Sequence, residues 1–290
     1  MSNVQTVYKF CRKYGLEVLS NLELKVTPPN QFNDPFEFTP KMVLSDPDRY
    51  VKRLLQKETI LKALCESDPP PCGVQAYLRW AKRHPDKLIE QLQKLLPELV
   101  AENEKQFLYE ISREWGILCM SGVRSQILMW GHYSDSHLGL VIGFDRSSPI
   151  FQEGVMALTP VKYVRKRPFF DSSWDDRSQK MALYRQQMMT FKNDDWSYEN
   201  EFRQILTLSS LPLVPRLHHD RNSGLKSTYY FLPFPPAAVV SVTVGPRCSP
   251  EFEKQVSRVL QKRAFSHVKL DRAILHKSDF VLEFDPVPPV

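Results

Sequence analysis

Helical periodicity over residues 46–113 interrupts a chain whose other patterns are those of short strands, and this interruption constrains the fold most. Within it, leucines recur at i, i+4, i+7, i+8 and i+11, the spacing of one apolar helix face. Those leucines are Leu88, Leu92, Leu95, Leu96 and Leu99. Pro97 is expected to kink or end this helix. A helical insertion at about 46–113, inside a single α+β domain of residues 1–290, is therefore predicted.

Outside the insertion, apolar and polar residues alternate in short runs, as they do in strands with one buried face. Helices are expected at 127–133, at 178–192 and after Ser249, where Ser249 suits the N-cap and Pro250 the first helical position. Strands are expected at 4–10, 22–26, 116–120, 138–145, 155–163, 202–208, 228–232, 239–244, 268–275 and 280–284. This order of elements favours a mainly antiparallel α+β fold.

Two glycines, Gly139 and Gly143, fall within one of these strand patterns. Glycine weakens a strand, and it often marks the close approach of a ligand or of another backbone segment. A close approach is therefore expected along residues 138–145.

The composition of the 290 residues excludes few classes of protein. A net charge of +6 suits nucleic acid, nucleotides or other anionic ligands, and it suits a merely soluble surface equally well. The five cysteines form no C-x-x-C pair, which disfavours zinc ribbons and thioredoxin chemistry. Without a secretory signal or an apolar run of about 20 residues, we expect a cytoplasmic protein with reduced thiols and no membrane contact.

Glu199, Glu201 and Arg203 need an explanation, because they open an apolar strand pattern. Spaced two apart in a strand, the three side chains would point to the same side at steps of about 6.6 Å. A strand-borne glutamate beside a cation suits an acid/base or sugar-binding role, and it suits a structural ion pair equally well. The residue pattern leaves both interpretations open.

Residues 128–139 gather a second group of polar and aromatic side chains. His132 and His137 are five apart and have no third ligand at standard spacing, which argues against zinc. No G-x-S-x-G elbow supplies a nucleophile, and Cys119 fits a structural cysteine better than a reactive one. The glycine motifs of P-loops and Rossmann folds do not occur. Tyr133 and the histidines are suited instead to stacking on a flat ligand or hydrogen-bonding to it.

Taken together, residues 32–37, 128–139 and 196–203 resemble a widespread bacterial family, domain of unknown function 2971. The three segments read Phe-Asn-Asp-Pro-Phe-Glu, Leu-Met-Trp-Gly-His-Tyr-Ser-Asp-Ser-His-Leu-Gly and Trp-Ser-Tyr-Glu-Asn-Glu-Phe-Arg. The opening residues 7–10 and the strand at 117–121 fit as well, so the resemblance spans nearly the whole chain. Leu138 departs from the family, which often has a basic residue there, so no phosphate-binding role follows for it.

The family's pattern is similar to that of the ADP-ribosyltransferase superfamily, which implies a split, mainly antiparallel sheet and NAD as substrate. By this resemblance Glu201 stabilises the ribosyl cation, and Glu199 completes the E-x-E spacing of some of these enzymes. The implied catalytic residues are Glu201, Glu199, His132 and Tyr133. The implied NAD-binding residues are Tyr8, Lys9, Asn33, Asp34, Trp130 and Arg203. No metal ligand is implied.

The first function that follows is an NAD-dependent ADP-ribosyltransferase or NAD glycohydrolase, acting as a toxin or phage-defence effector. The net charge and the helical insertion would recruit a nucleic-acid or protein target, and an antitoxin or defence-system protein is the expected partner.

Two alternatives belong to other classes of protein. One is a non-catalytic module that binds a nucleotide or a partner. Its pocket would be formed by Trp130, His132, Tyr133 and Trp196. The other is a metal-dependent nuclease, which needs carboxylates gathered around Mg²⁺. The candidate carboxylates are Asp34, Glu37, Glu199 and Glu201.

Overall fold

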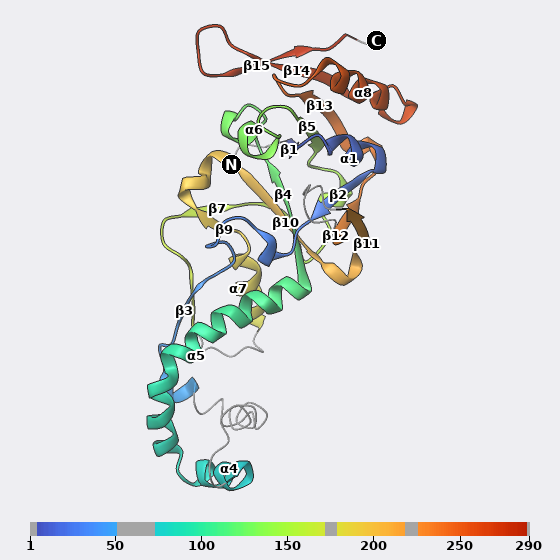
Figure 1. Ribbon diagram of the computed structural model, residues 1–290. Helices are drawn as coiled ribbons and strands as arrows, with labels where there is room; N and C mark the ends of the chain where they lie inside the picture. The colour runs from blue at the N-terminus through green and yellow to red at the C-terminus, as the bar shows by residue number, and fades with distance from the viewer. Residues whose placement is uncertain (1–4, 51–72, 172–178, 218–225, 289–290) are drawn as a thin grey trace. The chain divides into compact units, whose positions relative to one another are not determined.

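The computed structural model, shown in Figure 1, describes four stretches of the chain. They are residues 5–50, 73–171, 179–217 and 226–288. Contacts within the chain define two compact units. The larger comprises Met1–Glu37, Ile111–Arg165 and Met189–Val290, and the smaller comprises Phe38–Glu110 and Lys166–Met188. The predicted insertion at 46–113 falls almost wholly in the smaller unit, and its residues 51–72 lie outside the described stretches.

Eight strands form the central sheet of the larger unit, in the order β15-β14-β13-β5-β1-β4-β10-β6. Their bounds are β1 Thr6–Cys11, β4 Trp115–Ser121, β5 Leu140–Asp145, β6 Met156–Pro160, β10 Glu201–Thr207, β13 Val239–Val244, β14 Lys269–Leu275 and β15 Leu282–Pro286. Every neighbouring pair is antiparallel except β13 and β14, which are parallel. The predicted mainly antiparallel α+β fold is confirmed.

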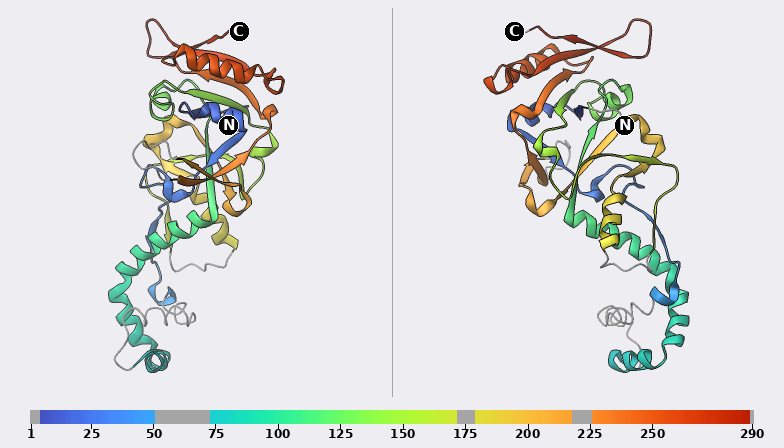
Figure 2. Two further views of the ribbon diagram at one scale, coloured as in Figure 1. Left: turned by 45° about the vertical axis from the view of Figure 1, so that its right-hand side comes forward. Right: turned by 180° about the vertical axis from the view of Figure 1, so that it is seen from behind.

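The parallel pair is made possible by helix α8 (Pro250–Leu260), which carries the chain back between β13 and β14. As predicted, the Ser249 hydroxyl caps this helix, accepting from the Phe252 N–H over 3.2 Å, and Pro250 opens it. Both views of Figure 2 show α8 together with the β14–β15 hairpin at one edge of the sheet.

The pairing of strands in the sheet is shortest between β1 and β4. These strands share a single registered pair, Tyr8 with Ser121, whereas β1 and β5 pair from Thr6 to Cys11. The two halves of the sheet therefore diverge from that pair, and the Lys9 ammonium bridges them by donating to the Cys119 carbonyl over 2.9 Å.

One row of residues crosses this junction. Ser121 pairs with Tyr8 on one side and with Glu201 of β10 on the other. Residues in register on neighbouring strands point to the same face of a sheet. Tyr8, Ser121 and Glu201 therefore share one face, at the place where the two halves of the sheet meet.

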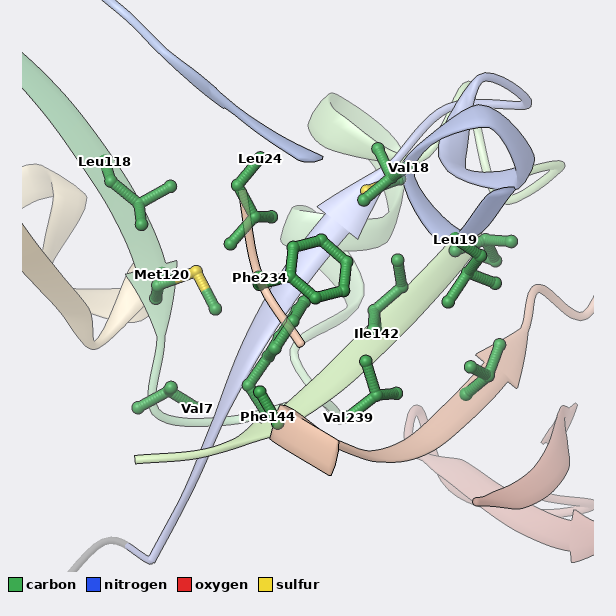
Figure 3. Packing of buried hydrophobic residues seen from close by; sticks show 14 of the residues in the cluster. Val7, Val18, Leu19, Leu24, Leu118, Met120, Ile142, Phe144, Phe234 and Val239 are labelled. Carbon is green, nitrogen blue, oxygen red and sulfur yellow. The ribbon is translucent and has the colours of Figure 1, made fainter. Parts of the chain in front are cut away.

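The main core covers the opposite face of the sheet, because alternate apolar side chains of its strands point there. Leu140, Ile142 and Phe144 of β5 are fully buried. Phe144 meets Phe234 edge-on with ring centroids 5.2 Å apart, and Figure 3 shows both rings among aliphatic side chains. Helices α1 (Gly15–Asn21) and α8 cover this face with Val18, Leu19, Phe252, Val256 and Leu260.

A smaller core on the first face holds helix α6 (Ile127–Tyr133) against the sheet. Trp130 is completely buried there, and its ring meets Phe10 edge-on with centroids 5.6 Å apart. The indole N–H of Trp130 also donates to the Arg124 carbonyl over 2.7 Å. This anchoring fixes the position of the helix that carries His132 and Tyr133.

Further short elements complete the larger unit. β2 (Glu23–Val26), β12 (Lys226–Pro233) and β11 (Leu213–Leu217) form a three-stranded antiparallel sheet, and β7 (Lys162–Val164) pairs parallel with β9 (Phe191–Asn193). Short 3-10 turns connect these elements. They are η1 Pro29–Gln31, η2 Pro149–Phe151, η3 Asp194–Glu199, η4 Leu208–Ser210, η5 Pro236–Ala238 and η6 Arg263–Phe265.

The smaller unit combines two separate stretches of the chain. Its elements are helix α4 (Val74–Arg83), most of α5 (Pro85–Glu114), α7 (Gln179–Met188), and the paired strands β3 (Lys41–Val43) and β8 (Phe169–Asp171). Phe107 of α5 and Phe170 of β8 are in ring contact at 5.6 Å. Residues 166–171 and 179–188 thus belong to the same unit as the described part of the insertion, an association that the sequence did not predict. No helix in the described stretches is long and apolar enough to cross a membrane.

Several local predictions are wrong. The helix expected at 178–192 ends at Met188, because residues 191–193 pair with β7 and tertiary pairing overrides helical spacing. Of the two outcomes expected at Pro97, an end of the helix is wrong because α5 continues to Glu114, whereas the course of the helix does bend (Figure 1). The strand expected at 155–163 is divided between β6 and β7. β10 is buried on both faces rather than half-buried, since the main core covers one face and Glu201, Arg203 and Ile205 are buried on the other.

Candidate functional site

The polar centre of the site lies where β10 begins. The turn η3 precedes this strand, and Asn200 between them adopts a left-handed conformation with φ of 44°. Glu199 therefore lies in the 3-10 turn and not on the strand, which corrects the prediction that Glu199, Glu201 and Arg203 follow one another along a strand. The reversal at Asn200 nevertheless brings the Glu199 and Glu201 carboxylates to one cation, Lys192.

Arg203, which is 0% exposed, joins two carboxylates. Its Nε donates to Glu201 Oε1 over 2.8 Å, and its Nη2 donates to Glu201 Oε2 over 3.0 Å and also to Glu37. Its Nη1 donates to the Met189 carbonyl over 2.9 Å. Both oxygens of Glu201 are thus held in a bidentate pair, the most directional geometry between a guanidinium and a carboxylate.

Lys192 of β9 completes the cluster. Its Nζ lies 3.0 Å from Glu201 Oε2 and 3.2 Å from Glu37 Oε1, and it donates to Glu199 Oε2. All of these side chains are buried. We name the set the buried charge cluster: Glu37, Lys192, Glu199, Glu201 and Arg203.

Three carboxylates face two cations in the buried charge cluster, so full ionisation leaves one excess negative charge. Burial raises the pKa of Glu201, but Arg203 and Lys192 outweigh burial and lower that pKa to about 2. Burial also raises the pKa of Glu199, and the Lys192 ammonium offsets this only in part. A proton taken up by the cluster therefore goes to Glu199 before Glu201.

Hydroxyl groups hold the glutamates from other elements. Tyr133 of α6 donates to Glu199 Oε1 over 2.7 Å, and the Tyr163 hydroxyl of β7 accepts from the Glu201 N–H over 2.7 Å. Ser121, in the sheet row described above, donates to the Glu199 carbonyl over 2.6 Å. Burial and the Glu199 charge raise the pKa of Tyr133, so this hydroxyl stays a hydrogen-bond donor.

Aromatic rings lie next to the cluster. His132 is exposed, and its ring centroid lies 6.2 Å from that of Tyr133 and 6.5 Å from that of Tyr198. Trp196 lies 6.1 Å from Tyr198, and Lys192 Nζ is 5.0 Å from the Trp196 ring centre. We name these four residues the aromatic rim: His132, Tyr133, Trp196 and Tyr198. A flat ligand stacked on this rim would lie close to Glu199, which Tyr133 contacts directly.

The remaining residues predicted for the site differ in their position relative to the buried charge cluster. Tyr8 is half-buried in the same sheet row as Glu201, and Lys9 bonds the Cys119 carbonyl as described above. Trp130 is enclosed in the smaller core, where its buried ring has no access to a ligand. Asn33 is exposed, and no contact joins it to the buried charge cluster among those the structure describes.

Asp34 makes backbone contacts that the sequence did not predict. Its Oδ1 accepts the Phe36 N–H over 2.9 Å and its carbonyl accepts the Glu37 N–H over 3.2 Å. Asp34 therefore shapes the turn that presents Glu37, and Glu37, rather than Asp34, pairs with Arg203. Short polar side chains that bond the backbone two residues on are typical of such turns.

The sequence pattern does not predict Lys192 and Tyr163 as residues of the site. It predicts Lys192 in a helix and Tyr163 at the end of a strand. The signal for Lys192 is weak: it consists of a polar residue next to Phe191, just before the Trp196 segment. Both residues reach the glutamates only because β7 and β9 pair with each other.

Cys119 shares the face of Arg203, its partner in the register of β4 and β10. Burial raises the pKa of its thiol well above the usual range, and the neighbouring Glu201 charge raises it further. A neutral thiol is a poor nucleophile, so Cys119 fits the structural role expected of it. Cys11 and Cys248 are also free, whereas Cys65 and Cys72 lie outside the described stretches.

Three of the four carboxylates named for a nuclease converge, namely Glu37, Glu199 and Glu201. The groups that lie between them are the Lys192 ammonium and the Arg203 guanidinium. No group of three or more His, Cys, Asp or Glu side chains in the described residues is arranged to hold a metal ion. The convergence of carboxylates is thus accounted for by ion pairing, and the nuclease stays a prediction.

Fold and site together define an α+β protein with a large, mostly antiparallel open sheet and a buried charge cluster at the start of one strand. Residues 129–204 match the family described as protein of unknown function (DUF2971). The match confirms the resemblance to that family over this range. The matched range contains every member of the buried charge cluster except Glu37. No curated protein and no solved structure matches the chain. The similarity to ADP-ribosyltransferases stays a prediction.

Proposed function

We propose that the protein is an ADP-ribosyltransferase-like enzyme that cleaves NAD, as a cytoplasmic toxin or phage-defence effector. The observation that carries the proposal is the position of two glutamates, Glu199 and Glu201, on one lysine beside the aromatic rim. Further support comes from the sheet, whose two halves diverge next to the row that contains Glu201.

The chemistry requires a negative charge close to the sugar. The bond between ribose C1′ and the nicotinamide nitrogen breaks, its electron pair leaves with nicotinamide, and the ribose becomes oxocarbenium-like before water or another nucleophile attacks C1′. A carboxylate held in place stabilises that developing positive charge without having to reorganise. In this proposal Glu199, which touches the rim residue Tyr133, faces the sugar.

Glu201 then acts through its partners. It is bound at both oxygens by Arg203 and shares Lys192 with Glu199. Its charge holds Lys192 in place, and Lys192 in turn positions Glu199. The rim residues His132 and Tyr133 would stack on the nicotinamide ring, because flat rings pack favourably on aromatic side chains.

The test is nicotinamide release from NAD, followed by mass spectrometry. We expect Glu199→Gln and Glu201→Gln each to lower the rate by about 100-fold or more, the usual loss when one electrostatic partner of a transition state is removed. The matched control is Asp195→Asn, an exposed carboxylate in the same turn, which should leave the rate unchanged. Far-UV circular dichroism checks that each variant is folded. Full turnover by folded Glu199→Gln would refute the assignment.

The raised pKa of Glu199 predicts the pH dependence of this activity. If the charged carboxylate is the working form, the rate falls as pH falls through a pKa that lies above the ordinary 4.5. The Tyr133 hydrogen bond favours the charged form of Glu199, so Tyr133→Phe should move this acid limb to higher pH. A pH–rate profile of both proteins measures the shift, and an acid limb that stays in place contradicts the role of Glu199.

A non-catalytic nucleotide-binding module is the second candidate, and one observation favours it. Glu199 and Glu201 are only 3% and 5% exposed, and both oxygens of each carboxylate are paired, those of Glu199 with Tyr133 and Lys192 and those of Glu201 with Arg203. A carboxylate so fully paired suits a structural role under a binding surface. Saturable NAD binding in a calorimeter, weakened by Trp196→Ala and with no nicotinamide released in the presence of cell lysate, would establish this function in place of the enzyme.

A further inference from the structure

The end of helix α4 and the start of helix α5, both in the smaller unit and labelled in Figure 1, carry a concentration of positive charge. From residue 79 to residue 87, four cationic side chains stand against one carboxylate. They are Arg79, Lys82, Arg83 and Lys87, with Asp86 as the acid. The resulting net charge of +3 is half of the chain's +6. Such a local excess attracts polyanions from solution.

The basic side chains of α4 face solvent, whereas its apolar side is buried. Leu78 and Ala81 are buried, at 4% and 0% exposure, whereas Arg79 and Arg83 are exposed. A helix that binds a lipid surface needs a free apolar face to enter the acyl boundary. Because the apolar face of α4 is already buried within the protein, a membrane is the poorer partner.

Arg79 and Arg83 are four residues apart, so they are neighbours on the helix surface. Like charges at this spacing destabilise a helix slightly. A phosphate bound between the two guanidinium groups would remove that repulsion, and arginine suits phosphate through its fork of N–H donors.

A column of rings runs beside the two arginines. Tyr77 and Trp80 have ring centroids 5.5 Å apart at an interplanar angle of 30°, and Trp80 and His84 have centroids 5.6 Å apart. Trp80 is half-buried, and it is three residues from Arg83, so the two side chains are neighbours on the helix surface. A basic surface with an accessible aromatic face is the arrangement that holds unpaired nucleobases and their phosphates.

We infer that Arg79, Trp80 and Arg83 form a binding surface for single-stranded nucleic acid. The arginines hold successive phosphates and Trp80 stacks on a base. A single strand is favoured over a duplex because stacking on Trp80 needs a base free of its own stack. Under the proposed function this surface would select a nucleic-acid acceptor, but the binding itself needs no NAD and is measured separately.

The experiment is fluorescence anisotropy of a labelled single-stranded oligonucleotide titrated with the full-length protein at several salt concentrations. Arg79→Glu with Arg83→Glu should raise Kd at least about tenfold and flatten the slope of log K against log salt by about 1.4, since each phosphate contact with a single strand contributes about 0.7. Trp80→Ala should raise Kd about tenfold with an unchanged slope.

The matched control is Lys254→Glu with Arg258→Glu on α8, which reverses two exposed cations at the same four-residue spacing. It should leave Kd within about twofold, and circular dichroism checks that both double variants are folded. Equal losses in the two double variants would mean general charge attraction and overturn the inference. Equal binding of a duplex, unaffected by Trp80→Ala, would also overturn it.

Two further measurements separate the remaining possibilities. Binding to vesicles of anionic phospholipid but not to the oligonucleotide would overturn the inference in favour of a membrane surface. Nicotinamide release from NAD in water should be the same in the Arg79→Glu, Arg83→Glu protein as in the wild type. Lost oligonucleotide binding with intact release supports the surface proposed here, and absent release with intact binding counts only against the proposed enzyme.

Discussion

Replacing Arg203 with methionine should lower the free energy of unfolding by about 3–5 kcal/mol, the usual cost of removing one partner from a buried ion pair. The side chain is 0% exposed and binds both oxygens of Glu201, together with Glu37 and the Met189 carbonyl. Methionine fills much of the same volume but donates no hydrogen bond. Glu201 and Glu37 would then share only Lys192 and would remain out of water. Urea denaturation measures the change.

An exposed arginine provides the matched control. Arg165 pairs with Asp194 over 2.8 Å, but its side chain is 89% exposed. Exposed pairs contribute little because water screens them, so Arg165→Met should leave the free energy of unfolding close to that of the wild type. Equal and small losses in the two variants would contradict the buried position of Arg203. Arg203→Lys should fall between them, since it keeps the charge and loses the bidentate geometry.

The buried charge cluster is poorly explained by stability alone. Apolar residues of similar volume often stabilise a protein as well as a buried ion pair does, or better. The five charged side chains of the cluster also leave an excess carboxylate, and Glu37 Oε2 is buried with no hydrogen-bond partner among the residues that the structure describes. Perturbed groups gathered in this way occur more often at functional sites than elsewhere. The buried charge cluster therefore favours a function for the start of β10.

Gly139→Ala should destabilise the fold by about 3 kcal/mol, at the upper end of the cost of overpacking. A Cβ at this position would lie 2.1 Å from the Cys11 carbonyl oxygen, 3.0 Å from Arg12 Cα and 3.0 Å from the Ser134 carbonyl oxygen. All three are backbone atoms, so no side-chain rotation relieves the clash. The Gly139 N–H also bonds the Ser134 carbonyl over 2.8 Å, which ties the loop after α6 to the start of β5. Thermal and urea unfolding measure the loss.

Gly131→Ala is the control for this prediction. A Cβ there would meet only His137 Nε2, at 3.9 Å, and Gly131 lies inside helix α6. Alanine in a helix interior is more favourable than glycine by roughly 0.5–1 kcal/mol, so this variant should be slightly more stable than the wild type. If Gly139→Ala is as stable as Gly131→Ala, the loop moves freely and the close approach does not constrain the fold.

Periodicity predicted most of the secondary structure. The spacing in helix α8, with Ser249 as its cap and Pro250 at its start, and the alternation along β5 are properties of a few consecutive residues, and the fold keeps them. The close approach expected along residues 138–145 is also present, since the Cys11 and Arg12 backbone fills the space beside Gly139. These features are local, so a pattern of neighbouring residues is sufficient to specify them.

The wrong predictions of secondary structure share one cause. Residues 191–193 follow a helical pattern but pair with β7 as a strand, and Glu199 follows a strand pattern but lies in a 3-10 turn. In both places a contact with a distant part of the chain overrides the local preference.

The amino-acid sequence is sufficient to predict the α+β class, the strands and helices with clear periodicity, and the three segments that resemble domain of unknown function 2971. The meeting of Glu37, Lys192 and Arg203 is a property of the fold, because it depends on the turn at Asp34, the pairing of β7 with β9 and the register of β10. Side-chain periodicity records which face of an element is buried, whereas a cluster of charges from separate segments depends on pairings that no local pattern contains.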